Sequence, residues 1–188
     1  MRTRMLAATL VAAAAALAAC SNTGDADSSA DFNKADVSFA QEMIPHHRQA
    51  TEMAEMAASR TENADVLELA EEISAAQGPE IETMTGWLES WGEDVPEDTG
   101  SMSGMDHSGM DSMPGMMSAD DMAELEDAQD ATFDELFLTM MVEHHEGAVE
   151  MARAEQKDGK NADAVELAEE IEVAQTEEIS TMRELLGS

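Results

Sequence analysis

The sequence predicts an all-α protein, a four-helix bundle made of two duplicated helical hairpins joined by a long Met-rich loop. Three observations predict this fold class. Residues 39–88 align with residues 137–186 without a gap, and about half of the aligned positions are identical. In both copies the apolar residues recur three and four positions apart, which is the spacing of a buried helix face. No stretch alternates with the period of two that is typical of a strand. Two such hairpins can bury their apolar faces against each other in one bundle.

The helix starts are marked by capping residues. The first helix of each copy is expected at about residues 33–60 and 118–157, and the latter opens with Ser-Ala-Asp-Asp, a capping-box pattern. The second helix of each copy starts after Asn63 and Asn161, because Asn is a good N-cap and the Asp that follows suits the helix dipole. The expected division of the chain is a signal peptide at 1–19, a lipidated Cys and tether at 20–32, the first hairpin at 33–92, the loop at 93–118 and the second hairpin at 119–188.

The start of the chain has the features of a bacterial lipoprotein signal. Two arginines precede an Ala-rich apolar run that ends in "LAAC", and this run is too short for a permanent membrane span. The small residues before Cys20 resemble a lipobox, which implies cleavage before Cys20 and acylation of that residue. An ordinary signal peptide that happens to end in Cys is the alternative. We therefore expect an extracytoplasmic protein, lipid-anchored to the cell membrane.

Charge and composition exclude several function classes. The net charge of −33 excludes nucleic acid as a partner and repels anionic lipid headgroups, so membrane contact is expected through the lipid anchor only. Cys20 is the only cysteine, which excludes disulfide chemistry within the chain. No catalytic triad or Gly-rich phosphate loop is present, so neither a hydrolase nor a nucleotide-binding protein is indicated. The acidic surface attracts cations instead.

Four of the five histidines occur as two matched pairs, in "MIPHHRQATEMA" and in "MVEHHEGAVEMA". Each pair falls near the middle of its predicted helix and on the apolar face, one turn after a Met. If the two hairpins pack about a pseudo-two-fold axis, the four imidazoles converge at the middle of the bundle. Neutral imidazole is the commonest protein metal ligand. The alternative is that the four rings are hydrogen-bonded and only fix the packing of the helices.

The same folding places further candidates near the imidazoles, since each second helix returns alongside the first. The predicted metal-site residues are His46, His47, His144, His145, Met43 and Met141, with Glu80 and Glu178 at the margin.

The loop between the hairpins carries a second candidate metal site. Its candidates are Met102, Met105, His107, Met110, Met113, Met116 and Met117. Methionine is ordinary filler in a helix core, but a Gly, Ser and Asp-rich loop has no core to fill. Thioether sulfur is a soft donor that suits Cu(I), and imidazole accepts Cu(I) or Cu(II). Copper is therefore the expected ion, although another transition metal is possible. A low-complexity linker or a sacrificial oxidation surface is the alternative.

The segments "FAQEMIPHHRQATEMA", "MPGMM" and "LTMMVEHHEGAVEMA", with the two "LAEEI" helices, resemble the DUF305 family from about Asp31 to the C-terminus. The resemblance implies a ferritin-like four-helix bundle in a secreted or lipoprotein bacterial protein of largely undefined function. It also implies copper binding or copper tolerance, which has been suggested for some members. The residues that match the paired motifs are His46, His47, His144 and His145, with Met43 and Met141 beside them.

Three functions remain open on the sequence. The favoured one is a copper-binding lipoprotein that sequesters copper or hands it on, without catalysis. A metal-dependent oxidase or peroxide-consuming protein is the enzyme alternative. Carboxylate-bridged iron oxidases of this architecture need Glu three residues before His, whereas Met43, Ile44, Met141 and Val142 occupy those positions here. A structural surface lipoprotein whose histidines only pack helices is the third.

Overall fold

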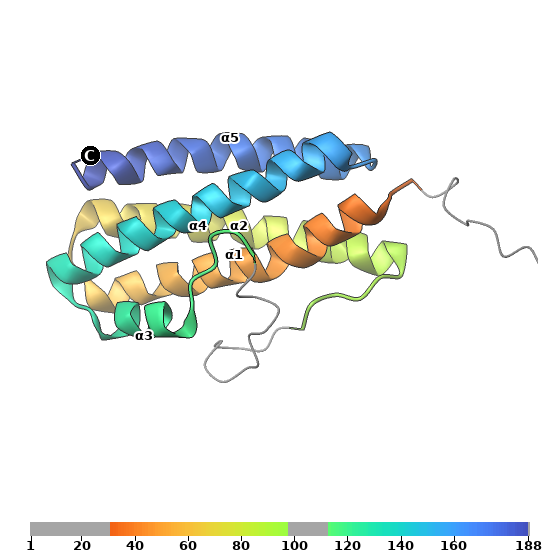
Figure 1. The fold of residues 1–188 in the computed structure, drawn as a ribbon. Helices are drawn as coiled ribbons and strands as arrows, with labels where there is room; N and C mark the ends of the chain where they lie inside the picture. The colour runs from red at the N-terminus through yellow and green to blue at the C-terminus, as the bar shows by residue number, and fades with distance from the viewer. Residues whose placement is uncertain (1–30, 98–112, 188) are drawn as a thin grey trace, which may run out of the picture.

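The computed structural model describes residues 31–97 and 113–187, which form five α-helices (Figure 1). The helices are α1 (Lys34–Arg60), α2 (Ala64–Trp91), α3 (Ala119–Asp127), α4 (Asp130–Asp158) and α5 (Ala162–Leu185). The predicted all-α four-helix architecture is confirmed, with α3 as a short addition outside the four long helices. Within the described residues, no helix is both long and apolar enough to cross a membrane.

The predicted caps start the helices. Asn63 and Asn161 each accept a hydrogen bond from the backbone of the first turn of α2 and α5. Ser118 and Asp121 form the predicted capping box of α3. Asn33 caps α1, where it forms a second capping box with Asp36. Each cap satisfies backbone N–H groups that have no partner inside the helix, so the sequence fixes these helix starts locally.

The two hairpins pack through their first long helices. α1 pairs with α2 and α4 pairs with α5, while α1 and α4 lie against each other in the centre. The start of α1 lies at the end of α4, because Asn33 Nδ2 donates to the Asp158 carbonyl oxygen at 3.0 Å, so α1 and α4 are antiparallel. α2 and α5 contact each other little. This arrangement settles the helix order, which the long connecting loop leaves open in the sequence.

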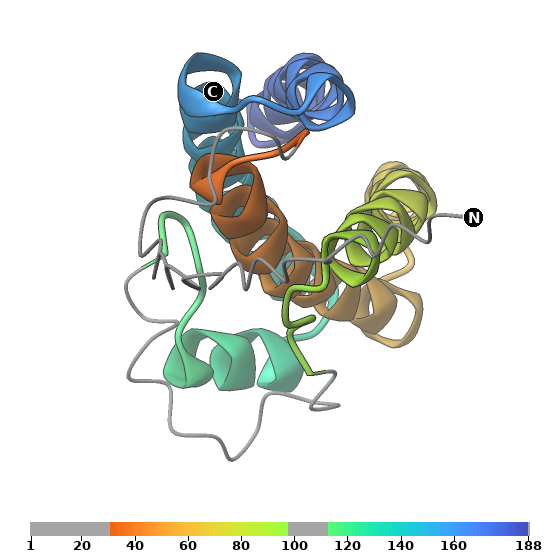
Figure 2. The same cartoon turned by 90° about the vertical axis from the view of Figure 1, so that its right-hand side faces the viewer.

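The prediction of one helix over residues 118–157 is wrong, because the chain breaks at residues 128–129 into α3 and α4. Asp130 follows the break with φ of 52°, a left-handed conformation that Asp adopts more readily than most residues. Before the break α3 runs across the bundle on the side away from α5 (Figures 1 and 2). Met122 and Leu125 of α3 are buried in the core.

The buried apolar residues form two clusters, one toward each end of the bundle. One cluster contains Met53, Ile73 and Phe137, and the other contains Phe39 and Met84. The histidine pairs of α1 and α4 lie between the two clusters along their helices. Each cluster anchors one end of the helices by burying apolar surface. A polar layer is therefore held rigidly between two apolar ends.

Candidate metal site

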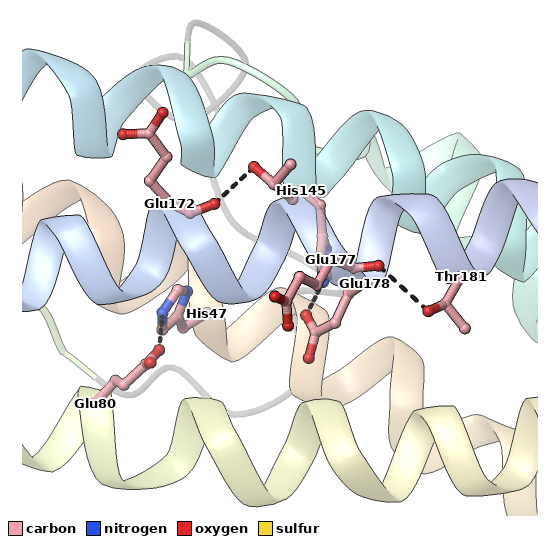
Figure 3. A network of polar contacts seen from close by, with 8 residues as sticks. His47, Glu80, His145, Glu172, Glu177, Glu178 and Thr181 are labelled. Carbon is pink, nitrogen blue, oxygen red and sulfur yellow. Dashed lines mark hydrogen bonds and ion pairs between the residues drawn. The ribbon is translucent and has the colours of Figure 1, made fainter.

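Two adjacent histidines lie near the middle of each central helix, and all four side chains are fully buried. Neighbouring residues on a helix point about 100° apart. His46 and His144 therefore face each other across the α1–α4 contact, with ring centroids 3.7 Å apart and the rings tilted by 38°. His47 faces α2, and His145 faces α5 (Figure 3). The structure thus brings the four predicted imidazoles together in one layer.

A glutamate from the second helix of each hairpin holds the outward-facing ring. His47 Nε2 lies 2.7 Å from Glu80 Oε2, and His145 Nε2 lies 2.7 Å from Glu178 Oε2 (Figure 3). A carboxylate only accepts hydrogen bonds, so in the neutral form of each ring Nε2 carries the hydrogen and Nδ1 carries the lone pair. The sequence places Glu80 and Glu178 at the margin of the site, and in the structure they orient the two rings.

The protonation of His46 is fixed in the same way by a backbone carbonyl. His46 Nε2 lies 3.0 Å from the carbonyl oxygen of Pro114, which can only accept. His46 therefore donates from Nε2 and keeps its lone pair on Nδ1. Metal-binding histidines are commonly oriented by a hydrogen bond to the nitrogen that does not bind the metal.

The two facing rings are neutral at physiological pH. Burial, together with the nearby His47 and His145, lowers the pKa of His46 to about 3. Burial also holds the pKa of His144 well below its usual value, again with contributions from the other three rings. A depressed pKa keeps the nitrogen lone pair free of a proton, which is the form that binds metal.

Most of the buried polar side-chain atoms that lack a hydrogen-bond partner within the described residues belong to this layer. They are Nδ1 of His46, His47, His144 and His145, Nε2 of His144, Nε2 and Oε1 of Gln77, and Oε1 of Gln175. The two glutamines precede Glu80 and Glu178 by one helical turn on the same face. Each unpaired buried polar group costs about 1–3 kcal/mol. A layer with so many free lone pairs is unfavourable by itself and suited to a bound cation.

The donor set fits a soft ion, but the four imidazole rings do not point at one common position. No three His, Cys, Asp or Glu side chains in the described parts of the chain are arranged as metal ligands. The His46 and His144 rings lie against each other at a tilt of 38°, so a shared ion requires at least one ring to rotate. Met43 and Met141 are fully buried one turn before the histidine pairs, and their thioethers are soft donors for Cu(I).

Residues 113–117, here called the covering segment, lie over the midpoints of α1 and α4 (Figure 1). The Gln49 side chain fixes this segment through two hydrogen bonds to Met117, each 2.8 Å long, one to its N–H and one to its carbonyl oxygen. The covering segment contains three of the predicted loop candidates, Met113, Met116 and Met117, and all three are half-buried. The structure therefore places these three methionines close to the histidine layer.

Two glycines allow the covering segment to approach this closely. A Cβ at Gly147 would lie 2.0 Å from the Pro114 carbonyl oxygen, and one at Gly115 would lie 2.5 Å from the Glu143 carbonyl oxygen. Gly115 also has φ of +74°, which favours glycine. We did not predict these residues from sequence. The repeat contains a sign of this difference, since Gly147 aligns with Gln49. In the first copy Gln49 holds the covering segment by hydrogen bonds, and in the second copy Gly147 leaves space for it.

The remaining candidates lie outside the described residues. They are Cys20, Met102, Met105, His107 and Met110.

Fold and site together define a class of protein, duplicated four-helix bundles with paired histidines in a buried central layer. The chain belongs to the DUF305 family, "Domain of unknown function (DUF305)", whose family profile matches residues 36–186. No curated protein sequence matches the chain.

Three solved structures illustrate the similarity. A DUF305 protein of Streptomyces coelicolor, thought to be secreted, is 31% identical with a TM-score of 0.72, covering 81% of this chain and 92% of that one. A DUF305 fragment from Deinococcus radiodurans is 30% identical with a TM-score of 0.71, covering 82% and 97%. CopM in its Cu(II)-bound form is 32% identical with a TM-score of 0.66, covering 80% and 94%.

Proposed function

We propose that this protein binds copper in the layer of four buried histidines and sequesters it or hands it on, outside the cytoplasm and without catalysis. The observation that carries the proposal is the set of four buried Nδ1 atoms without a hydrogen-bond partner, three of them on rings whose Nε2 is already hydrogen-bonded. Structures of CopM in Cu(I)-bound, Cu(II)-bound and Ag-bound forms support copper as the ion.

The chemistry of the donors favours Cu(I) over harder ions. Buried neutral imidazoles and thioethers suit a soft ion with a low coordination number, whereas carboxylate and water oxygens suit Mg²⁺ and Ca²⁺. The covering segment adds thioethers beside the layer, so copper captured by the loop methionines has a short path to the histidines. Met102, Met105, His107 and Met110 are proposed as the outer part of this capture site.

A competition titration against a Cu(I) chelator tests the proposal on the chain that begins at residue 20. We expect the protein to remove Cu(I) from a chelator present at micromolar concentration, and to leave Zn²⁺ with a matched chelator. Replacing the loop methionines 102, 105 and 110 by Ser should remove one class of sites and leave the other. Failure to compete for Cu(I) would refute the proposal.

The two glutamates that hold His47 and His145 should tune the affinity. The double variant Glu80→Gln with Glu178→Gln keeps a hydrogen-bond acceptor at each position. It removes the negative charge, which in the wild type fixes the imidazole ring and makes it more basic. We expect about a 10- to 100-fold loss of copper affinity, as is usual for such supporting residues. Competition titration measures it.

A matched control is available on the same two helices. The exposed Glu82 and Glu177 carry the same charges without touching a histidine, so the double variant Glu82→Gln with Glu177→Gln should keep its affinity. An equal loss in both double variants would show that only overall charge matters.

The proposal includes the predicted lipid anchor at Cys20. A signal peptide over residues 1–19 would deliver the chain outside the cytoplasm, where thiols are oxidised and thioethers remain usable as Cu(I) donors. Mass spectrometry of the mature N-terminal peptide tests this part, since an unmodified Cys20 would exclude the anchor.

A further inference from the structure

Asp36 joins the start of α1 to the turn between α4 and α5. The Asp36 side chain is fully buried, and it accepts hydrogen bonds from the backbone N–H groups of Asn33 at 2.5 Å, Lys160 at 2.9 Å and Asn161 at 2.8 Å. Three N–H donors are the usual environment of an ionised carboxylate. Asp36 therefore carries a negative charge at this end of the bundle.

Glu155 lies beside Asp36 in the opposite situation. It is only 2% exposed, and neither of its oxygens meets an N–H or O–H donor within the described residues. Its polar neighbour is the Asp36 carboxylate. Two ionised carboxylates repel each other, whereas a protonated carboxyl group donates a strong hydrogen bond to a carboxylate. Because the backbone donors keep Asp36 ionised, the proton belongs on Glu155.

We propose that Glu155 and Asp36 share one proton at neutral pH. This proton closes a latch, which is the contact between Asp36, Glu155 and residues 159–161, and the latch opens at alkaline pH. The latch fixes the start of α1 to the second hairpin. It is independent of the histidine layer and of copper binding.

The charges around Glu155 agree with this assignment. Burial, the hydrogen bond with Asp36 and the charges of Asp36 from α1 and Asp158 from α4 together raise the pKa of Glu155 to about 8. Burial also acts to raise the pKa of Asp36, but the hydrogen bond from Glu155 and the backbone N–H groups of Asn161, Asn33 and Lys160 hold it below its usual value.

A cavity lies close to the pair. Glu155 and Asp158 are among the residues that line this cavity of about 290 Å³, which also borders Glu42 and Glu150, while both carboxyl oxygens of Glu155 are buried.

The latch is built at one end of the bundle only. At the equivalent place in the other copy, Asn63 Nδ2 donates to Asp134 Oδ2 at 2.8 Å, and Ala57 aligns with Glu155. The turn is shaped around the acid, since a Cβ at Gly159 would lie 2.3 Å from Glu155 Oε1. One end of the bundle can therefore respond to pH while the pair at the other end has no shared proton.

The sign of the pH effect follows from the raised pKa. The ordinary pKa of a Glu side chain is 4.5 and the pKa of Glu155 in the folded protein is about 8, so the folded state binds the extra proton between these two values. The stability that the shared proton contributes is complete below the unfolded pKa and is lost as pH rises through the folded pKa. Glu155→Gln removes this dependence, because its neutral amide can donate to Asp36 at every pH.

Carboxyl-carbon NMR of the full mature chain gives the direct test. We expect one Glu resonance to titrate near pH 8, to disappear in Glu155→Gln, and to titrate at lower pH in Asp36→Asn. The exposed Glu169 provides the matched control, since Glu169→Gln has the same charge change and should leave that resonance in place. A wild-type protein in which every Glu titrates below about pH 6 would overturn the proposal.

Amide hydrogen exchange measures whether the latch opens. After correction for the intrinsic base-catalysed rate, we expect protection of the Lys160 and Asn161 amides to fall about tenfold or more between about pH 6 and about pH 9 in the wild type. Glu155→Gln should keep its protection over the same range. The fluorescence of Trp91 gives a second readout of the segment just before α1, because Phe32 stacks on Trp91 with ring centroids 4.6 Å apart. Equal loss of protection in wild type and Glu155→Gln would overturn the proposal.

Discussion

Replacing His144 by Leu is expected to abolish the copper-induced rise in melting temperature while leaving the metal-free protein as stable as the wild type or more stable. His144 is fully buried, and neither ring nitrogen has a hydrogen-bond partner among the described residues. Removing an unpaired buried polar group and filling its place with an apolar one is usually neutral or stabilising. The substitution therefore separates the metal site from the packing.

The measurement is thermal unfolding with and without Cu(I), together with the chelator titration. A ligand at about 100 times its Kd stabilises the wild type by about 2.7 kcal/mol, and this stabilisation should be missing in the variant. The double variant Glu82→Gln with Glu177→Gln is the control, since neither exposed residue belongs to the proposed sites and the variant should keep the shift. If His144→Leu lowered the stability of the metal-free protein by several kcal/mol, the ring would be a packing element, as the structural alternative holds.

Replacing Gly147 by Ala is expected to displace the covering segment from the histidine layer and to destabilise the protein by about 1–3 kcal/mol. The new Cβ would lie 2.0 Å from the Pro114 carbonyl oxygen, which is backbone and cannot rotate away. Moving Pro114 breaks its hydrogen bond with His46 Nε2 and pulls on the two bonds between Gln49 and Met117. The lining of the site is then opened without changing a candidate ligand.

The matched control is Gly86→Ala in the interior of α2, where an added Cβ meets nothing within 4 Å. This control should be stabilised by about 0.5–1 kcal/mol, since Ala is the better helix former. Chemical denaturation gives both values, and exchange of the Met117 amide reports the covering segment directly. Unchanged stability and a protected Met117 amide in Gly147→Ala would contradict the assigned contact.

Much of the fold could be predicted because its signals are local or repeated. Asn63, Asn161 and Ser118 start their helices through bonds to the following turn, which depend on neighbouring residues alone. The meeting of the histidine pairs was also predictable. Duplication places both pairs at the same height of equivalent helices, and helical spacing places them on the apolar face. The break between α3 and α4 was not predictable, because no Gly or Pro marks residues 128–129.

The duplication and the helical spacing are enough to predict that two equivalent helical hairpins form one bundle and that imidazoles, thioethers and acids occupy its middle. Only the packing of distant segments places Glu80, Glu178 and Pro114 against Nε2 of three of the four rings and leaves their Nδ1 free. It also decided that Gly147 admits the covering segment and that Glu155 lies against Asp36. The physical reason is that periodicity shows which face of a helix is buried but not which atoms lie opposite it. The proton on an imidazole or a carboxyl group is placed by those opposite atoms, and they come from distant parts of the chain.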